Sequence, residues 1–362
     1  MAAIANEQDW INVSSYAEDS PIASPKKWLT KEEVVELSTI KHWRWMAELA
    51  LTWALMLGTL QAGILAALYL PTWATVLVFV VAYFLMGSWY NMIIQWVHEA
   101  SHYNFSRNKM LNDAIGDVFA AGPIFLSVGG YRWQHIPHHV HLNNPDKELQ
   151  FTTWICLRGD QLFIQSINHL LGFWYFLFVA STRIVGKPER NLPPIPARSI
   201  WVWVGTFGTH GEVLALCVAQ GVWYAYPLLW VLPIITIGYL INNFRTIIEH
   251  QASSDICDLG MAKMPAITRV IRAHPVERFL VAPVGFYYHH EHHTWPGIPY
   301  HRLSEARKLL EQRGYFQQPG VFFSRGYLRS IWRLGHEPGY GLRLLNPFLN
   351  TEEFEDHDHH AH

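Results

Sequence analysis

The sequence predicts an all-α integral membrane protein, with four transmembrane helices in two hairpins, interfacial helices between them and a cytoplasmic histidine-rich cap. Three observations predict this fold class. Hydrophobic residues make up 50% of the 362 residues and charged residues only 15%, whereas an ordinary soluble domain carries roughly 25% charged residues. The 17 Trp point the same way, because amphipathic rings accumulate where lipid meets water. The chain also contains 21 His, nearly as many as its 27 Lys and Arg combined.

Composition excludes several other classes. The formal net charge is −2 and no basic stripe is present, so a nucleic-acid partner is not expected. The three Cys are scattered, which argues against a disulfide scaffold, an iron–sulfur cluster or a CxxC metal site. The first twenty residues have neither a basic n-region nor an apolar h-region. They are therefore not a cleaved secretory signal, and we expect the first forty or so to stay on the side where they are made.

Four stretches are long and apolar enough to cross a bilayer, whose hydrocarbon core of roughly 30 Å requires about 20 residues of helix. The first hairpin is expected at 45–70 and 72–96, which are separated by Pro71. The second is expected at 200–220 and 222–240, with a break at Gly221. These two connections contain no Lys or Arg, whereas cations flank the other ends of the spans. Both termini and the central loop should therefore be cytoplasmic.

Two further apolar stretches are interpreted as interfacial or re-entrant helices. The stretch 115–131 is short and is broken by Asp117, Pro123 and a Gly pair. The stretch 161–185 is longer but contains Asn168 and His169, and a fifth span is its alternative.

Three histidine clusters follow the apolar stretches. His98 and His102 lie four residues apart directly after the second span, so they share one face of a helix. The second cluster has HxxHH spacing, with Pro137 inside it, so its helical geometry stays open: His135, His138 and His139. The third cluster repeats this spacing after the fourth span: His289, His292 and His293. His250 follows on a probable continuation of the fourth span and is a plausible ninth member.

These clusters predict a metal site on one side of the membrane. Imidazoles packed this densely would leave buried nitrogens unused unless a metal shared their lone pairs, although a pH switch and chance enrichment are alternatives. The clusters meet on one side of the membrane only if an even number of spans separates the second cluster from the third, so the stretch 161–185 should not cross.

The number of histidines indicates how many ions are bound. Zinc sites use four ligands, or three plus water, so eight or nine imidazoles suit two ions. Imidazole binds iron, copper, nickel and zinc alike, so the ligands do not identify the metal. The clusters lie at the ends of membrane helices, which suggests a lipid substrate. Oxidation of an unactivated lipid C–H bond by O2 needs a metal oxidant, and this favours two irons. The acidic, His-rich end at 356–362 is interpreted as a disordered tail.

The segments HEASH (98–102), HIPHH (135–139) and HHEHH (289–293), with paired spans between the second and third, resemble the histidine boxes of the membrane fatty acid desaturase superfamily. The stretches 244–250 and 277–303 are similar to that superfamily as well. The resemblance covers roughly 45–310 and implies a non-haem di-iron centre, O2 as co-substrate and an external electron donor, either ferredoxin or cytochrome b5 with its reductase. By position it implies nine iron ligands: His98, His102, His135, His138, His139, His250, His289, His292 and His293.

Several neighbouring residues have open roles. Glu99, Glu249 and Glu291 adjoin ligands and would either orient imidazole N–H groups or face solvent. His141 and His290 lie outside the boxes and are expected near the ligands or on the surface. Two arginines, Arg132 and Arg245, are expected as headgroup anchors rather than partners of a substrate carboxylate. Acyl-CoA desaturases have an Asn one turn before the isolated histidine, which is His250 here. This chain has Thr246 at that position, and the nearest Asn is Asn243. The difference weakens an assignment to the acyl-CoA branch of the superfamily.

The sequence therefore predicts an O2-dependent di-iron desaturase acting on a long acyl chain of a lipid. A lipid hydroxylase and a terminal-alkene-forming fatty acid decarboxylase are rivals on the same centre, and a membrane zinc sensor is the rival from another class. The expected organisation is a cytoplasmic segment 1–44, a membrane domain 45–310, and a cytoplasmic segment 311–362.

Overall fold

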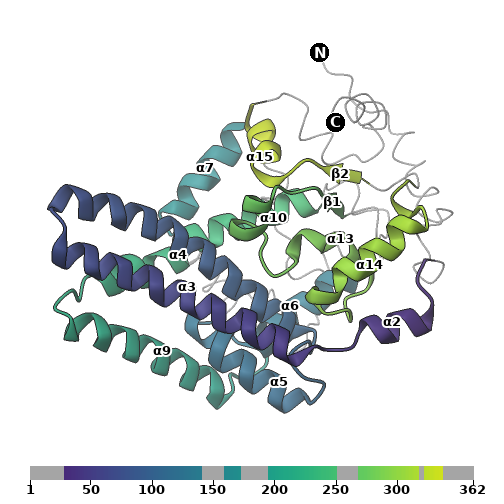
Figure 1. The fold of residues 1–362 in the computed structure, drawn as a ribbon, viewed down its shortest axis with the longest axis horizontal. Helices are drawn as coiled ribbons and strands as arrows, with labels where there is room; N and C mark the ends of the chain where they lie inside the picture. Colours follow the sequence, from purple (N-terminus) through teal and green to yellow (C-terminus); the bar gives the residue numbers. More distant parts are fainter. Residues whose placement is uncertain (1–27, 141–158, 173–194, 251–267, 318–321, 337–362) are drawn as a thin grey trace.

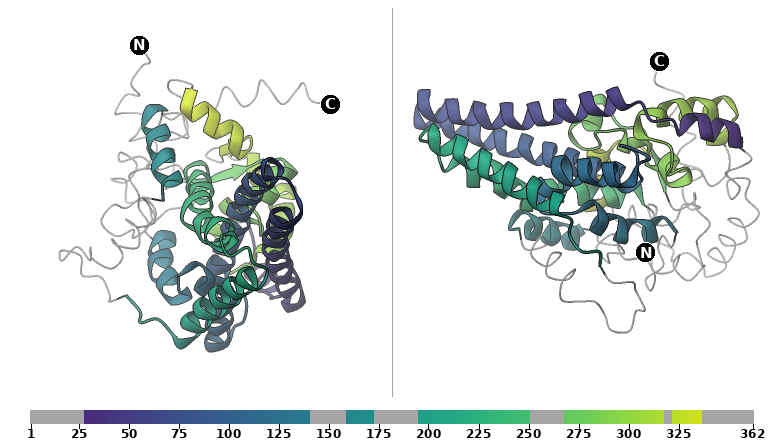
Figure 2. Two further views of the ribbon diagram at one scale, coloured as in Figure 1. Left: turned by 90° about the vertical axis from the view of Figure 1, so that its left-hand side faces the viewer. Right: turned by 90° about the horizontal axis from the view of Figure 1, so that it is seen from below.

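A computed structural model describes residues 28–140, 159–172, 195–250, 268–317 and 322–336. Nearly all of the regular structure in these residues is helical. Two three-residue strands, β1 (Arg269–Ile271) and β2 (Phe322–Ser324), pair in parallel. Long helices extend to one side of the molecule, and short helices and the strands form a cap at their other end (Figures 1 and 2). The all-α membrane fold expected from the sequence is confirmed.

The first hairpin consists of α3 (His42–Tyr69) and α4 (Thr72–Ser101), with Pro71 at the turn. At 1.5 Å per residue, helices of this length exceed the roughly 30 Å of hydrocarbon, and both qualify as spans. From Met86 onward every residue of α4 is buried, whereas its first half is mostly exposed or half-buried. The second half of α4 is therefore the central element of the fold, and it carries the first histidine pair into the cap.

The second hairpin consists of α9 (Ile200–Ala219) and a fourth span over Tyr226–Glu249. This span is built from two π-type segments, η6 (Tyr226–Val231) and η7 (Ile234–Gly238), followed by α10 (Tyr239–Glu249). Gly221, with φ of +75°, ends the turn after α9, and the span starts a few residues later than expected. The helix continues to Glu249, so the predicted continuation toward His250 is confirmed. Four candidate spans are found among the described residues.

The stretch 115–131 forms a sharply bent helix. It comprises α5 (Lys109–Gly116), η3 (Asp117–Ala121), η4 (Gly122–Ile124) and α6 (Val128–Val140). The two arms, Lys109–Ile124 and Val128–Val140, meet at 91°. Ala120, Ala121 and Ile124 are buried where the bend packs against α4 and α9. The bend is thus held inside the helical bundle, as a re-entrant segment would be, and does not lie flat on its surface.

Side chains of neighbouring segments satisfy the backbone groups that this bend leaves unpaired. The Thr206 hydroxyl donates to the Gly122 carbonyl at 2.8 Å, and His210 Nε2 lies 3.1 Å from the Pro123 carbonyl. The Val128 amide, at the start of α6, donates to the Asp117 carboxylate at 2.8 Å. Such compensation is required wherever helical hydrogen bonds are broken at membrane depth. It also fixes the direction in which α6 leaves the bend.

Of the stretch 161–185, only the part up to residue 172 lies in the described chain. It belongs to α7 (Gly159–Leu170), which packs on α15 (Tyr327–His336), α10 and η7. At 12 residues α7 is shorter than a span requires. The rest of the stretch lies outside the described residues.

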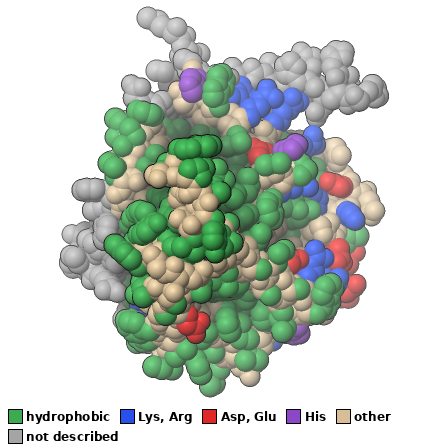
Figure 3. Space-filling model, turned by 60° about the vertical axis from the view of Figure 1, so that its left-hand side comes forward, with side chains coloured by type: hydrophobic (Ala, Val, Ile, Leu, Met, Phe, Trp, Pro, Cys, Tyr) green, Lys and Arg blue, Asp and Glu red, His purple; other side chains and the backbone are tan. Residues whose placement is uncertain are grey.

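The cap joins parts of the chain that are distant in sequence. Its remaining elements are α2 (Lys31–Leu37), α12 (Pro275–Leu280), η8 (Phe286–Tyr288), α13 (His289–Thr294), α14 (Tyr300–Gln312) and η9 (Tyr315–Gln317). Trp28 and Leu37 share one buried cluster with Leu303, Leu310 and Tyr315. Trp28 and α2 of the expected N-terminal segment, and Tyr315 of the expected C-terminal segment, therefore pack on the cap beside α14. Apolar side chains cover the face over the long helices, and charged side chains gather toward the cap (Figure 3).

Candidate metal centre

Nine histidines converge where the long helices enter the cap. Five form one group with ligand atoms within 4.8 Å of one another: His98, His102, His135, His139 and His292. Four form a second group by the same criterion: His138, His250, His289 and His293. The groups adjoin, because the rings of His139 and His293 stack with centroids 4.3 Å apart. All nine residues named from the sequence are brought together, and their division into five and four is compatible with two ions.

Helical spacing explains this division. The i,i+4 pairs stay together: His98 with His102, His135 with His139 in α6, and His289 with His293 in α13. His138 of α6 joins the group of four, away from His135 and His139, and His292 of α13 joins the group of five, away from His289 and His293. α6 and α13 therefore contribute to both groups. α6 is helical throughout despite its internal Pro137, which resolves the local geometry that the sequence left open.

The distances between ring nitrogens fit a shared ion. The Nε2 atom of His135 lies 3.0 Å from that of His102 and 2.9 Å from that of His139. In the second group the Nε2 atom of His250 lies 2.9 Å from that of His289 and 3.2 Å from that of His293. Two nitrogens at right angles around an ion, each about 2.1 Å away, would be roughly 3.0 Å apart. The imidazoles are thus spaced as adjacent ligands.

Burial keeps these imidazoles neutral. It is the main cause that lowers the pKa of His289, His292 and His293 well below the usual value, and neighbouring imidazoles add to the effect. A neutral imidazole has one lone pair available for a metal. The Nε2 atom of His98, a member of the first group, has no hydrogen-bond partner in the described structure. The cluster therefore combines unprotonated nitrogens with incompletely satisfied polar atoms, as expected of a site for metal ions.

Two buried carboxylates lie beside the histidine groups. Glu99 Oε1 lies 3.5 Å from His98 Nδ1, and Glu249 Oε2 lies 3.4 Å from His289 Nδ1. Glu99 is held by the Asn104 amide and the backbone N–H of Tyr300. Both carboxylates are thus placed to orient an imidazole of one group each.

Glu291 and His290 lie in α13 but point away from both groups. The Glu291 carboxylate is fully buried and accepts from Arg307 Nη2 at 2.8 Å. His290 is also fully buried, with Nε2 2.7 Å from the Tyr315 hydroxyl and Nδ1 3.0 Å from the Thr268 hydroxyl. The alternative that the three glutamates face solvent is wrong, since none exposes more than 2% of its surface. His141 lies outside the described residues.

The two arginines expected at lipid headgroups have other positions. Arg245 is 5% exposed and pairs with Glu249 one turn away in α10. The Tyr327 hydroxyl donates to the same carboxylate at 2.7 Å. Arg132 pairs with Asp113 at 2.6 Å and donates to the Ser101 carbonyl. Both guanidiniums brace elements that carry histidines, a role that the sequence pattern did not indicate.

No amide occupies the position one turn before His250. The Thr246 hydroxyl donates back to the Asn242 carbonyl at 2.9 Å. The Asn243 side chain contacts His169 of α7. Neither residue therefore supplies the amide that acyl-CoA desaturases place there.

An unusual backbone turn delivers α13 to the site. Val284 has φ of +53° and the next residue, Gly285, has φ of +70°. A β-branched residue rarely adopts positive φ, so this turn stores strain of the kind that clusters at functional sites. A Cβ on Gly285 would lie 3.1 Å from the Tyr300 carbonyl, which explains why the sequence has Gly at this position. No motif in the sequence had marked this turn.

Comparison with known proteins agrees with this geometry. A family model described as fatty acid desaturase matches residues 71–325, more than half of the chain, and this region contains all nine histidines. The chain belongs to the fatty acid desaturase family. The resemblance stated from the histidine boxes is thereby confirmed, and the desaturase family makes the protein a membrane oxidoreductase.

Curated desaturases are similar to most of the chain. A dihydrorhizobitoxine desaturase of Bradyrhizobium elkanii is 24% identical over 272 residues, covering 71% of this chain and 74% of the relative. An sn-1 oleoyl-lipid 12-desaturase of Arthrospira platensis is 22% identical, covering 76% and 86%. An sn-1 acyl-lipid omega-3 desaturase (ferredoxin) of a Nostoc species is 28% identical, covering 71% and 72%. The identities are low, so these relatives support the family and not a particular substrate.

Proposed function

We propose that this desaturase uses O2 and two iron ions to introduce a double bond into a long acyl chain of a lipid. The convergence of nine neutral imidazoles in adjoining groups of five and four carries the proposal. Relatives named as acyl-lipid desaturases support the lipid substrate. A saturated chain offers no group for acid–base or nucleophilic attack, so a metal-based oxidant is the chemistry that this substrate requires.

Each histidine group would hold one ion. The first ion would have five nitrogen ligands, from α4 and the residue after it, α6 and α13, and the second would have four, from α6, α13 and the residue after α10. The set contains imidazole only, which excludes thiolate-dependent sites and suits iron. Bound iron would allow O2 to act as the oxidant: O2 would take two electrons and two protons from the acyl chain, two electrons from the donor and two protons from solvent, and leave as two waters.

The surrounding residues of the chain would hold the ligands in position. Glu99 and Glu249 would accept the Nδ1 protons of His98 and His289, so that Nε2 presents its lone pair to the ion. Arg245 and Tyr327 would fix the Glu249 carboxylate in turn. Because the site is buried, bulk water is excluded from the reacting carbon.

Electrons would come from a separate protein, either a ferredoxin or cytochrome b5 with its reductase. The scattered cysteines provide no ferredoxin cluster, and one relative is named with ferredoxin. The Lys and Arg bias of the loops favours a cytoplasmic site. The donor would then reach the cap without crossing the membrane.

Mass spectrometry of lipids and volatiles from cells that express the protein tests this function. A product that has lost two hydrogens from an acyl chain is expected, and His138→Ala should abolish it while the protein stays in the membrane. His336→Ala, at an exposed residue of α15, is the matched control and should keep activity. Gain of one oxygen would indicate a hydroxylase, and a shortened terminal alkene would indicate a decarboxylase. A purified protein with zinc, without iron and without O2-dependent turnover would overturn the enzyme assignment in favour of a sensor.

A further inference from the structure

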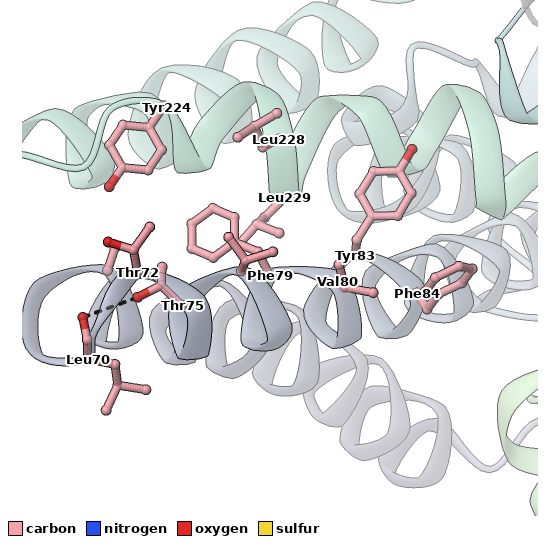
Figure 4. A pocket seen from close by; sticks show the side chains of 12 residues that line it. Leu70, Thr72, Thr75, Phe79, Val80, Tyr83, Phe84, Tyr224, Leu228 and Leu229 are labelled. Atoms are coloured by element: carbon pink, nitrogen blue, oxygen red, sulfur yellow. Dashed lines mark hydrogen bonds between the residues drawn. The ribbon is translucent and has the colours of Figure 1, made fainter.

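An apolar groove of about 630 Å³ lies in the membrane part of the molecule, away from the histidine groups. Its walls are the first half of α4, the end of α3 and the start of the fourth span (Figure 4). Phe79 and Val80 line it from α4, and Leu228 and Leu229 line it from the facing segment (Figure 4). The groove belongs to neither of the site's histidine groups.

Two of the hydroxyl groups along the groove, those of Thr75 and Tyr83, are already paired within the protein. The Thr75 hydroxyl donates to the Ala66 carbonyl at 2.9 Å. The Tyr83 hydroxyl pairs with that of Thr236 at 2.6 Å. These groups have their partners outside the groove, so an occupant gains no hydrogen bond from them. An apolar ligand fits this lining better than a polar one.

The length of the groove matches one leaflet of a bilayer. Its lining on α4 runs from Thr72 to Phe84, which spans roughly 18 Å at the helical rise. Half of the hydrocarbon core is about 15 Å thick. Exposed aromatic rings surround the hairpin turns at the Thr72 end, with Trp73 70% and Trp223 62% exposed. Such rings mark the level of the lipid headgroups, so the groove starts at the interface and runs toward the midplane.

The histidine groups lie at the opposite end of the same helix. Phe79 and His98 are separated by roughly 28 Å along α4, from the helical rise. An acyl chain that enters from the leaflet on the metal side reaches the midplane after about 15 Å. It therefore reaches at most the Phe84 end of the groove and leaves the rest of the lining, toward Thr72, unfilled. The occupant has to come from the other leaflet.

We propose that this groove binds one acyl chain of a phospholipid from the leaflet opposite the metal centre. The chain would fill the space between α4 and the start of the fourth span, next to the contact of Gly63 with Leu229. The reciprocal amide pair of Gln61 and Gln220 also joins the two hairpins, at 2.9 and 3.1 Å. The lipid is thus a structural component of the distal half of the bundle and not a substrate.

Photo-crosslinking of phospholipids to the holoenzyme in nanodiscs tests the proposal. A diazirine near the carboxyl end of the acyl chain should label the Thr72 end of the groove, and one near the methyl end should label the region of Tyr83 and Phe84. Val80→Trp, which fills the groove, should lower this labelling at least tenfold. Val81→Trp is the matched control: Val81 is 59% exposed and does not line the groove, so labelling should stay within twofold. Leu228→Trp fills the groove from the other wall and should behave as Val80→Trp does.

Iron content and a monodisperse elution profile show that each variant is folded, because the metal centre is distant from the groove. Equal labelling of the wild type and Val80→Trp would overturn the proposal. The reverse order of the two probes would mean that the chain enters from the metal side, which also overturns it. Loss of a dimer in Val80→Trp would assign the groove to a second copy instead. Displacement of the label by a free fatty acid during turnover would assign it to the substrate.

Discussion

The adjacent residues His292 and His293 provide a direct test of the two-ion arrangement. Both are buried in α13, but His292 belongs to the group of five and His293 to the group of four. His293→Ala would leave three imidazoles around one ion, whereas His292→Ala would leave four around the other. The two substitutions remove the same side chain from the same helix, so a difference between them reports on the metal sites.

The magnitude follows from the number of ligands. A four-ligand zinc site contributes about 10–16 kcal/mol, or roughly 3 kcal/mol per ligand, and iron binds somewhat more weakly. Loss of His293 should therefore weaken its ion by roughly a hundredfold. Equilibrium dialysis of the purified protein against graded free Fe(II), with iron per chain measured by mass spectrometry, gives both affinities. We expect His293→Ala to retain about one iron per chain at concentrations that saturate the wild type.

His290→Ala is the control, because His290 is also buried in α13 but points away from both groups and bonds to Tyr315 and Thr268. It should lose thermal stability but keep its iron. Equal iron loss in His290→Ala and His293→Ala would show that collapse of α13, and not ligand removal, causes the loss. Full retention of both irons in His293→Ala would remove this residue from the ligand set.

Three further outcomes are expected. Glu249→Gln leaves buried Arg245 without its anionic partner and should lower the free energy of unfolding by about 3–5 kcal/mol, measured through the thermal midpoint in detergent. Adding Arg245→Met to this variant should restore part of the lost stability. Additive effects of the two substitutions would contradict the pairing. Gly87→Ala places a methyl group against Ile237 and should destabilise by about 1–3 kcal/mol, whereas Gly58→Ala, with open space around it, should be neutral or stabilising by up to about 1 kcal/mol. The metal-free protein should lose stability as the pH falls below about 6.5, the usual pKa of histidine in an unfolded chain. Burial holds the pKa values of the α13 histidines below that value in the folded protein. The unfolded chain therefore takes up protons first, which favours unfolding. A thermal midpoint that stays level from pH 7.5 to 5 would contradict this last expectation.

Local periodicity accounts for what could be predicted. The lengths of the apolar stretches gave the four spans, and the i,i+4 spacing placed His98 with His102 and His289 with His293 on common faces. The requirement that all clusters reach one side gave the even number of crossings. Each of these inferences depends on residues within one element, or on counting elements.

Contacts between elements could not be predicted in this way. The sequence left Glu249 between an orienting and a solvent-facing role, because helical spacing does not say which neighbour covers a face. Tyr327 and Arg245, which hold that carboxylate, lie in α15 and α10. The bend at Gly122 and Pro123 was recognised as a break, but its burial depends on Thr206 and His210 of α9.

The sequence by itself determined the membrane class, the four spans and the nine histidines, because apolar length and helical spacing are local properties of the chain. Only the tertiary structure decided which histidines share a group. His138 joins His250 and not its neighbour His139, because the two side chains leave α6 in different directions and the packing of α6 on α4 decides which histidines each one meets. The same packing places the glutamates inside the protein and leaves the distal groove between α4 and the fourth span.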